Sequence, residues 1–383
     1  MYAFSGFHNI KKSLLMLSVK QAVSSEETSG VFAQIAETNH EQVVFCNDPD
    51  TGLKSIIAIH DTTIGPALGG TRMWNYGNEN EALNDVLRLS RGMTYKAALS
   101  GINLGGGKAV VIGDSKTDKT EALWRRYGKF VDSLNGKYIT AEDVGTSTRD
   151  MEYIAMETKW VTGVPEYMGG SGDPSPVTAY GTYLGMKACG KEVWGNDRLE
   201  GKKVLVQGVG HVGEFLVDHL SKEGAKIFIS DIDNTKLKDI TKKYKDITVV
   251  DKDEVYDIDM DIYAPCALGA TLNDDTISRL KCSIIAGGAN NQLADENIHA
   301  QLLKDKGILY APDFLINAGG VINVYFELEG YNRDRAYGTT ELIYDRTLKI
   351  IQDTKNNDIT THEAALKAAE KRIEEIAKIK SKR

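Results

Sequence analysis

Residues 202–220 read KKVLVQGVGHVGEFLVDHL, and this stretch predicts the fold of the second half of the chain. An apolar strand-like run is followed by Gly208, Gly210 and Gly213 in GxGxxG spacing, and then by a helix-like run. Such glycines let the backbone approach a pyrophosphate at a helix N-terminus. The motif alone is weak evidence, but a strand before it and a helix after it are the context that a dinucleotide site requires. We therefore expect a Rossmann-like domain here.

The residues near this turn favour NAD over NADP. Asp231 follows the next predicted strand, where a carboxylate can accept a hydrogen bond from a ribose 2′-hydroxyl and would repel a 2′-phosphate. Val212, inside the glycine motif, is also assigned to the cofactor site. Two alternatives stay open, a strand–helix turn without a ligand and an Asp231 that is only a surface acid.

Beyond residue 181, strands and helices alternate along the chain, which implies a parallel sheet covered on both faces. The Gly- and Pro-rich segment 168–181 is the best candidate for a domain boundary. From Thr339 onward the chain is charged and helical in pattern. The expected elements are strands over 203–207, 226–230, 247–250, 259–264, 283–287 and 308–311, with a helix over 211–223 and further helices between them.

The first half of the chain has a different pattern. Segment 62–74 is rich in glycine and too irregular for a helix. Asp118 and Glu121 have capping-box spacing at the start of a helix that follows Asp114. The other expected elements are a hairpin of strands over 42–47 and 55–60, a helix over 79–91 and a strand over 137–140.

Two lysines in the stretch from Gly92 to Asp114, GMTYKAALSGINLGGGKAVVIGD, indicate chemistry on amines or carbonyls. No acidic residue lies between Lys96 and Lys108, and Lys108 follows three glycines that we interpret as a corner. An ammonium with little water and a second lysine nearby can lose its proton near neutral pH. One lysine would hold a substrate carboxylate and the other would act as a general base. The alternative for each is a solvated surface ammonium.

Asp143 in TAEDVG is a candidate second proton carrier. Glu142 stands beside it, and adjacent side chains of an extended segment point to opposite sides. At most one of the two carboxylates is therefore expected to face a cleft. The alternative is that Asp143 braces or caps a loop.

Composition excludes several classes of protein. The chain has 383 residues, 42% hydrophobic and 26% charged, as expected for two globular domains. A net charge of −8 gives no basic surface for nucleic acid, and no apolar run is long enough to span a bilayer. Four cysteines without metal-ligand spacing suggest a reduced, cytoplasmic protein with no bound metal. Residues 1–30 are expected to be an untargeted extension.

Six blocks of sequence resemble the Glu/Leu/Phe/Val amino acid dehydrogenase family, most closely its leucine-specific members. They occur in the family's order between about residue 30 and residue 325, and they are long enough to be specific. The blocks are GPALGGTRMW (65–74), RGMTYKAALSGINLGGGKAVV (91–111), TAEDVG (140–145), QGVGHVG (207–213), AGGANNQL (286–293) and INAGGVINV (316–324).

The resemblance implies an α/β protein with two domains around a cleft that closes by hinge motion. An N-terminal substrate-binding and oligomerisation domain would comprise 1–165 and 350–383, and an NAD-binding Rossmann-like domain would comprise 166–349. Homo-oligomers are expected, octamers by family analogy.

The resemblance also implies roles for individual residues. Lys96 would hold the substrate carboxylate, Lys108 would activate water for attack on the imine, and Asp143 would shuttle protons to and from the substrate nitrogen. Three further residues are similar to those that border the nicotinamide: Thr178, Ala267 and Asn290.

The substrate side chain is expected to be apolar. Glutamate-specific members have a lysine where this chain has Leu68, and a glutamate carboxylate buried here without a counter-charge would be very costly. The remaining residues assigned to the pocket are Gly69, Met93, Val321 and Val324. Ordinary core packing is the alternative reading of Leu68 and the two valines.

Together these features predict reversible, NAD-dependent deamination of L-leucine and other branched-chain L-amino acids to 2-oxo acids and ammonia. Such a pocket separates leucine from valine by only about 1–3 kcal/mol. Valine or phenylalanine dehydrogenase therefore stays an alternative, as does a catalytically silent NAD-binding homologue.

Overall fold

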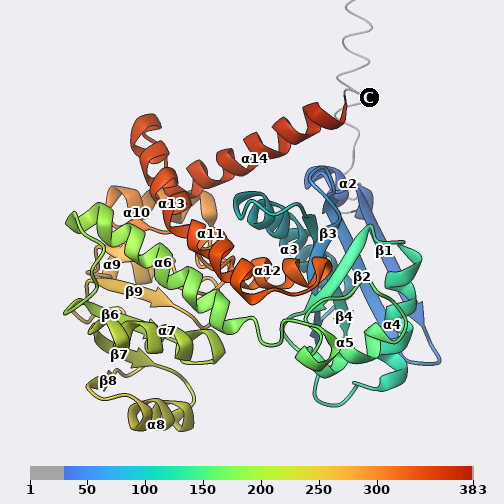
Figure 1. Ribbon diagram of the computed structural model, residues 1–383, viewed down its shortest axis with the longest axis horizontal. Coiled ribbons are helices and arrows are strands. Elements are labelled where there is room, and N and C mark those ends of the chain that lie inside the picture. Colours follow the sequence, from blue (N-terminus) through green and yellow to red (C-terminus); the bar gives the residue numbers. More distant parts are fainter. Residues whose placement is uncertain (1–29, 382–383) are drawn as a thin grey trace, which may run out of the picture.

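A computed structural model describes residues 30–381, so the expected N-terminal extension lies outside the described residues. The chain folds into two α/β halves, each built on its own sheet (Figure 1). Helix α2 (Val31–Glu37) precedes the first sheet. The α/β class and the two-sheet architecture expected from the sequence are confirmed.

The first sheet has five strands in the order β1-β2-β4-β3-β5. Strands β1 and β2 form the expected antiparallel hairpin, whereas β3 lies parallel to both β4 and β5. The bounds are β1 Gln42–Asp48, β2 Leu53–Asp61, β3 Ala67–Trp74, β4 Gly105–Ile112 and β5 Tyr138–Glu142. Strand β3 was not predicted, because its glycines hide the alternation that identifies a strand.

Helices cover both faces of this sheet. Helix α3 (Glu79–Leu99) packs Leu83, Val86 and Leu87 against one face. Helices α4 (Glu121–Ser133) and α5 (Thr148–Ala155) cover the other, where Trp124 and Tyr127 are fully buried. Burial of apolar side chains on both faces is the main stabilising contribution to such a three-layer structure.

The second sheet has six parallel strands in the order β11-β10-β9-β6-β7-β8. Side chains alternate along β6, where Val204 and Val206 face one core and Leu205 faces the other. The strands are β6 Lys203–Gln207, β7 Lys226–Ser230, β8 Ile247–Val249, β9 Ile262–Pro265, β10 Ile284–Ile285 and β11 Leu309–Tyr310. All six were expected, although four are shorter than predicted.

Helices from both halves meet at the junction between the two sheets. Helix α3 of the first half and helices α12 and α14 contribute to one continuous apolar cluster with the second sheet, and they lie near the junction in Figure 1. The remaining bounds are η2 Glu166–Met168, α6 Ser175–Trp194, α7 His211–Glu223, α8 Asn234–Lys243, α9 Asp274–Arg279, α10 Glu296–Asp305, α11 Asp313–Ile316, α12 Gly319–Tyr325, η3 Phe326–Glu329, α13 Arg333–Asn357 and α14 Thr361–Lys380.

Three local predictions need correction. Helix α3 continues through Gly92 to Leu99, beyond the predicted end, and so Lys96 lies on its last turn. Thr120, not Asp118, caps α4, because its hydroxyl accepts the hydrogen bond from the Leu123 amide. The C-terminal helical region begins before Thr339 and is divided into α13 and α14. The assignment of the last helices to the substrate-binding domain stays a prediction.

Glycines let β3 and β4 lie in contact, which gives a test of this packing. A Cβ on Gly69 would lie 1.7 Å from the carbonyl oxygen of Gly107, a backbone atom that cannot move aside. We expect Gly69→Ala to lower the free energy of unfolding by about 3 kcal/mol, or to prevent folding. Urea denaturation measures the change.

Gly92→Ala is the matched control, because a Cβ on this helical glycine meets nothing within 4 Å. Its free energy of unfolding should rise by about 0.5–1 kcal/mol. Equal effects of the two substitutions would contradict the packing described here.

Candidate functional site

A cavity of about 570 Å³ lies between the two halves and collects most of the predicted site residues. The first half contributes both lysines and the TAEDVG loop, and the second contributes the start of α6, the start of α7 and helix α12. The predicted residues on its wall are Leu68, Met93, Lys96, Lys108, Asp143, Thr178, Val212, Asn290, Val321 and Val324.

Lys108 is a buried lysine on β4, with 6% of its surface exposed. The interpretation of the three glycines before Lys108 as a corner is wrong. They form the extended start of β4. Their role in close backbone approach is confirmed, since a Cβ on Gly106 would lie 2.1 Å from the hydroxyl of Thr94 on α3. The glycines thus allow the helix to lie directly on the strand that carries Lys108.

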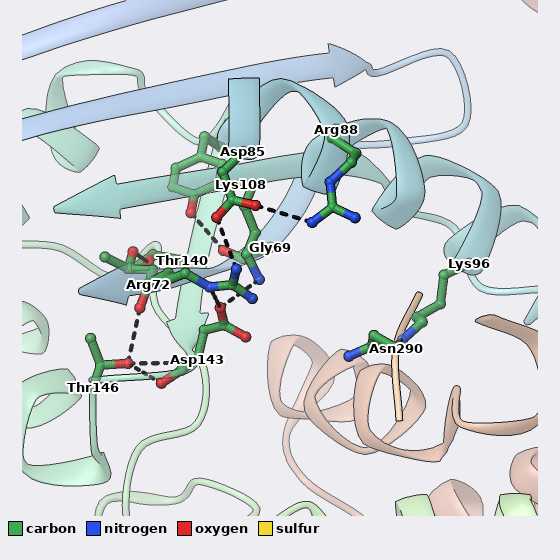
Figure 2. A network of polar contacts seen from close by, with 12 residues as sticks. Gly69, Arg72, Asp85, Arg88, Lys96, Lys108, Thr140, Asp143, Thr146 and Asn290 are labelled. Atoms are coloured by element: carbon green, nitrogen blue, oxygen red, sulfur yellow. Dashed lines mark hydrogen bonds and ion pairs between the residues drawn. The ribbon is translucent and has the colours of Figure 1, made fainter. Parts of the chain in front are cut away.

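Asp143 neutralises this lysine. Its Oδ2 atom lies 3.0 Å from Lys108 Nζ and also accepts a hydrogen bond of 3.0 Å from Arg72 Nε (Figure 2). Burial by itself raises the pKa of Asp143, but the two cations outweigh it and hold the pKa below its usual value. Asp143 is therefore ionised and has a cation on two sides.

A second carboxylate balances Arg72. Its NH1 group donates to Asp85 Oδ2 over 2.8 Å, and the Tyr76 hydroxyl donates to the same oxygen. The Arg72 side chain thus links α3 to the loop after β5. Arg72 lies within the quoted GGTRMW block but was not predicted as a site residue, because a pattern in sequence does not show which carboxylate an arginine will meet.

Lys96 lies across the cavity from this cluster and contacts the other half of the molecule. Its Nζ donates to Asn290 Oδ1 over 2.8 Å, and Asn317 Nδ2 donates to the same oxygen. Burial lowers the pKa of Lys96 to about 8, and Lys108 adds to this effect, whereas Asp313 and Asp143 oppose it. The lowered pKa was expected on the lysine that acts as general base, which the resemblance makes Lys108. It belongs instead to Lys96, which the resemblance assigns to the substrate carboxylate.

The glycine turn has the shape that a pyrophosphate needs. Gly208 has a φ of +95°, and a Cβ there would lie 2.7 Å from Ala267, so only glycine fits. A Cβ on Gly213 would lie 2.0 Å from the Gly208 oxygen, whereas Gly210 faces open space. Helix α7 begins after Gly210 with no side-chain cap, which leaves its N–H groups for a ligand.

Asp231 lies beside this turn at the end of β7. Its Oδ2 accepts a hydrogen bond of 2.8 Å from the Val209 amide, and its Oδ1 accepts one from the Asp233 amide. The side chain therefore braces the turn, and it keeps acceptor capacity for a further donor. Ala267 also lies at the turn, against Gly208 and outside the cavity wall.

Apolar side chains form part of the cavity wall. Leu68 on β3 is 2% exposed, and Val321 and Val324 on α12 are each 7% exposed. All three line the cavity, as does Met93 on α3. Gly69 does not, because it packs against Gly107, and its neighbour Gly70 lies on the wall instead.

The expectation that only one of Glu142 and Asp143 faces the cleft is wrong. Both residues line the cavity, because β5 ends at Glu142 and the chain turns into a loop at Asp143. Burial and three nearby carboxylates raise the pKa of Glu142 to about 7. The sequence placed this residue beside a candidate but offered no sign of its environment.

Among residues 30–381, no group of three or more His, Cys, Asp or Glu side chains is arranged to hold a metal ion. In the same range, no helix is long and apolar enough to cross a membrane.

Two family models match the chain in order. The model for the Glu/Leu/Phe/Val dehydrogenase dimerisation domain matches residues 40–160, and the model for glutamate/leucine/phenylalanine/valine dehydrogenase matches residues 169–235 and 229–381. The chain belongs to this family. It is an amino acid dehydrogenase, as the resemblance of the six blocks implied, and the dimerisation-domain match supports oligomerisation.

Relatives of this family member carry different substrate names. A leucine dehydrogenase from Thermoactinomyces intermedius is 54% identical over 92% of this chain and 95% of its own. A phenylalanine dehydrogenase from Lysinibacillus sphaericus is 49% identical over 90% of this chain and 91% of its own. The crystal structure of L-tryptophan dehydrogenase from Nostoc punctiforme is 48% identical, with a TM-score of 0.79, and covers 91% of this chain and 99% of its own.

The lowered pKa of Lys96 predicts a pH-dependent gain in stability when its charge is removed. Between the folded pKa of about 8 and the ordinary value of 10.5, the unfolded chain binds more protons, so the wild-type free energy of unfolding rises with pH. Lys96→Met should therefore raise the free energy of unfolding by about 1 kcal/mol at pH 7, and this gain should shrink by pH 10.

Chemical denaturation at several pH values measures this difference. Lys54→Met, at an exposed position on β2, is the matched control and should show little change with pH. A gain for Lys96→Met that stays constant from pH 7 to pH 10 would contradict the lowered pKa.

Proposed function

We propose that this family member deaminates L-leucine and other branched-chain L-amino acids with NAD, reversibly, to 2-oxo acids and ammonia. The observation that carries the proposal is a single cavity whose wall combines Lys96, Lys108 and Asp143 with apolar side chains. The same cavity is bordered by the half of the molecule that contains the glycine turn. The 54% identical leucine dehydrogenase supports the same substrate class.

Lys96 would anchor the substrate carboxylate. Its ammonium lies on the cavity wall, about one turn of α3 from Met93, and donates a hydrogen bond to a neutral amide oxygen. A carboxylate is a stronger acceptor for an ammonium than an amide oxygen is, so a substrate can replace Asn290 as the partner of Lys96. Binding of the carboxylate favours the protonated form of Lys96 and raises its pKa again.

Lys108 and Asp143 would carry the protons. Lys108 would first give its proton to Asp143 and would then, as the free amine, take the proton from water as the water attacks the imine carbon. Asp143 would pass the proton that it received on to the substrate nitrogen. The 3.0 Å contact between their charged groups is short enough for direct transfer. Arg72 would position Asp143 by holding the same oxygen from the other side.

The residues of the glycine turn fit NAD, and the family to which the chain belongs uses NAD(P). The open space at Gly210 and the uncapped start of α7 would hold the pyrophosphate. Asp231 would accept from the ribose and disfavour NADP. Val212, Thr178 and Asn290 would border the nicotinamide end. When bound, NAD would accept the hydride from the substrate Cα.

Leu68, Val321 and Val324 would select the substrate side chain. They present no charge to a distal carboxylate, which disfavours glutamate. The phenylalanine and tryptophan dehydrogenases among the relatives are nearly as similar to this chain as the leucine enzymes are. An aromatic amino acid is therefore the second candidate substrate. By analogy with the family, we also propose that the protein is a cytoplasmic octamer. Its substrate-binding domain would comprise 1–165 and 350–383, and its NAD-binding domain would comprise 166–349.

A panel of L-amino acids with NAD and NADP side by side tests this proposal. Leucine, valine, phenylalanine, tryptophan and glutamate should rank by kcat/KM with leucine first and glutamate far below, and NAD should exceed NADP. Formation of NADH at 340 nm measures each rate. A preference for phenylalanine or tryptophan would favour an aromatic amino acid as the substrate. Activity confined to glutamate would contradict the assignment of an apolar side-chain pocket.

Lys108→Ala tests the base. Turnover should fall by about 10²–10⁴-fold, while binding of NADH, followed by its fluorescence, should change less than about twofold. Lys116→Ala, at an exposed position after β4, is the matched control and should keep full activity. Turnover that survives in Lys108→Ala would remove Lys108 from this role. Binding of NADH by the wild type without turnover of any amino acid would indicate a silent homologue.

A further inference from the structure

Glu142 is a carboxylate on the cavity wall that the proposed mechanism does not use. It is the last residue of β5, directly before Asp143, and both line the cavity with Lys108. Its side chain is half-buried and lies close to Gly163, since a Cβ on that glycine would be 3.6 Å from Glu142 Cγ. Glu142 therefore lies on the cavity wall close to the segment that leads into the second half.

Within residues 30–381, the Glu142 carboxylate has no hydrogen bond or ion pair. Its neighbour differs sharply, because the Asp143 carboxylate is neutralised by both Lys108 and Arg72. A half-buried carboxylate without a cation is costly to keep ionised. The cavity thus contains one balanced carboxylate and one unbalanced carboxylate, side by side.

The charges around Glu142 are mostly negative. Asp143 follows it in the chain, Asp173 comes from the segment before α6, and Glu327 comes from η3. His211 at the start of α7 is the opposing influence, and Lys96 and Lys108 are the cations on the same cavity wall. Burial first, and then the repulsion of the three carboxylates, raises the pKa of Glu142 to about 7.

An amino acid substrate carries the charges that this arrangement lacks. Its carboxylate is assigned to Lys96, and its α-ammonium needs an anion that is not already paired. We propose that the Glu142 carboxylate accepts a hydrogen bond from the substrate α-ammonium and supplies its counter-charge in the bound complex. This inference rests on the proposed function and adds a substrate-binding residue to it.

The proposal has a consequence that a structural role for Glu142 does not share. A cation beside the carboxylate favours its ionised form, so substrate binding near pH 7 expels the proton of Glu142 to solvent. Lys96 acts with the opposite sign, because a bound carboxylate makes it take up protons. With a pKa of about 7, Glu142 should release about half a proton per site at pH 7.

Calorimetric titration of L-leucine into the protein saturated with NADH measures this release, since NADH and leucine do not react with each other. The apparent enthalpy, measured in buffers of different ionisation enthalpy, gives the number of protons. The wild type should release about half a proton at pH 7, and Glu142→Gln should release none. Glu142→Asp keeps the charge and should recover most of the release.

Steady-state kinetics provide a second test of the role of Glu142. At pH 8.5, Glu142→Gln should raise KM for L-leucine about tenfold, and KM for the matching 2-oxo acid, which has no ammonium, should change less than about twofold. The difference between wild type and variant should shrink at pH 6, where Glu142 is protonated. Glu121→Gln, an exposed carboxylate on α4, is the matched control.

The outcomes separate this inference from the proposed function. If the wild type turns over leucine but Glu142→Gln keeps the proton release, or raises both KM values equally, Glu142 is not the partner of the ammonium. If leucine neither binds nor reacts, both proposals fail. If leucine binds with a proton release that Glu142→Gln abolishes, the inference stands, even where another amino acid proves to be the better substrate.

Discussion

A buried ammonium must be neutralised, and the pairing of Lys108 with Asp143 is the constraint on which the rest of the site depends. To meet it, β4 and the end of β5 must lie in one sheet with β3 between them. Arg72 on β3 then reaches the same carboxylate oxygen from its own strand. Two neighbouring strands and the loop that follows a third thus each supply one charged group to a single cluster, and this cluster leaves little freedom in the register of the strands.

Glycine makes that arrangement sterically possible. Gly106 allows α3 to contact β4 through Thr94, and Gly69 allows β3 to contact β4 at Gly107. In each case a single methyl group would separate the two elements. The same helix carries Lys96 on its last turn, so the close contact also sets the distance between the two lysines across the cavity. Packing and chemistry are coupled here through residues without side chains.

Much of the second half could be predicted from sequence, because its strands are short apolar runs separated by helices and its glycine turn has a characteristic spacing. Strand β3 could not, since Gly69 and Gly70 replace the side chains that would mark an alternating strand. The site was predictable where a residue type reveals its chemistry, as for Lys96, Lys108 and Asp143. The partners Arg72 and Asn317 were missed because their importance depends on the residues that the tertiary structure brings into contact with them, and local spacing carries no record of that.

The contact between Lys96 and Asn290 has a consequence for how the two halves of the molecule are joined. The ammonium of Lys96 on α3 donates to an amide oxygen from the opposite half, and this oxygen also accepts a hydrogen bond from Asn317. Under the proposed function, an incoming substrate carboxylate would therefore have to replace Asn290 as the partner of Lys96. The hydrogen bond between Lys96 and Asn290 contributes about 1 kcal/mol net, so competition from Asn290 would weaken substrate binding about fivefold. In return, each binding event would remove one direct hydrogen bond between the two halves.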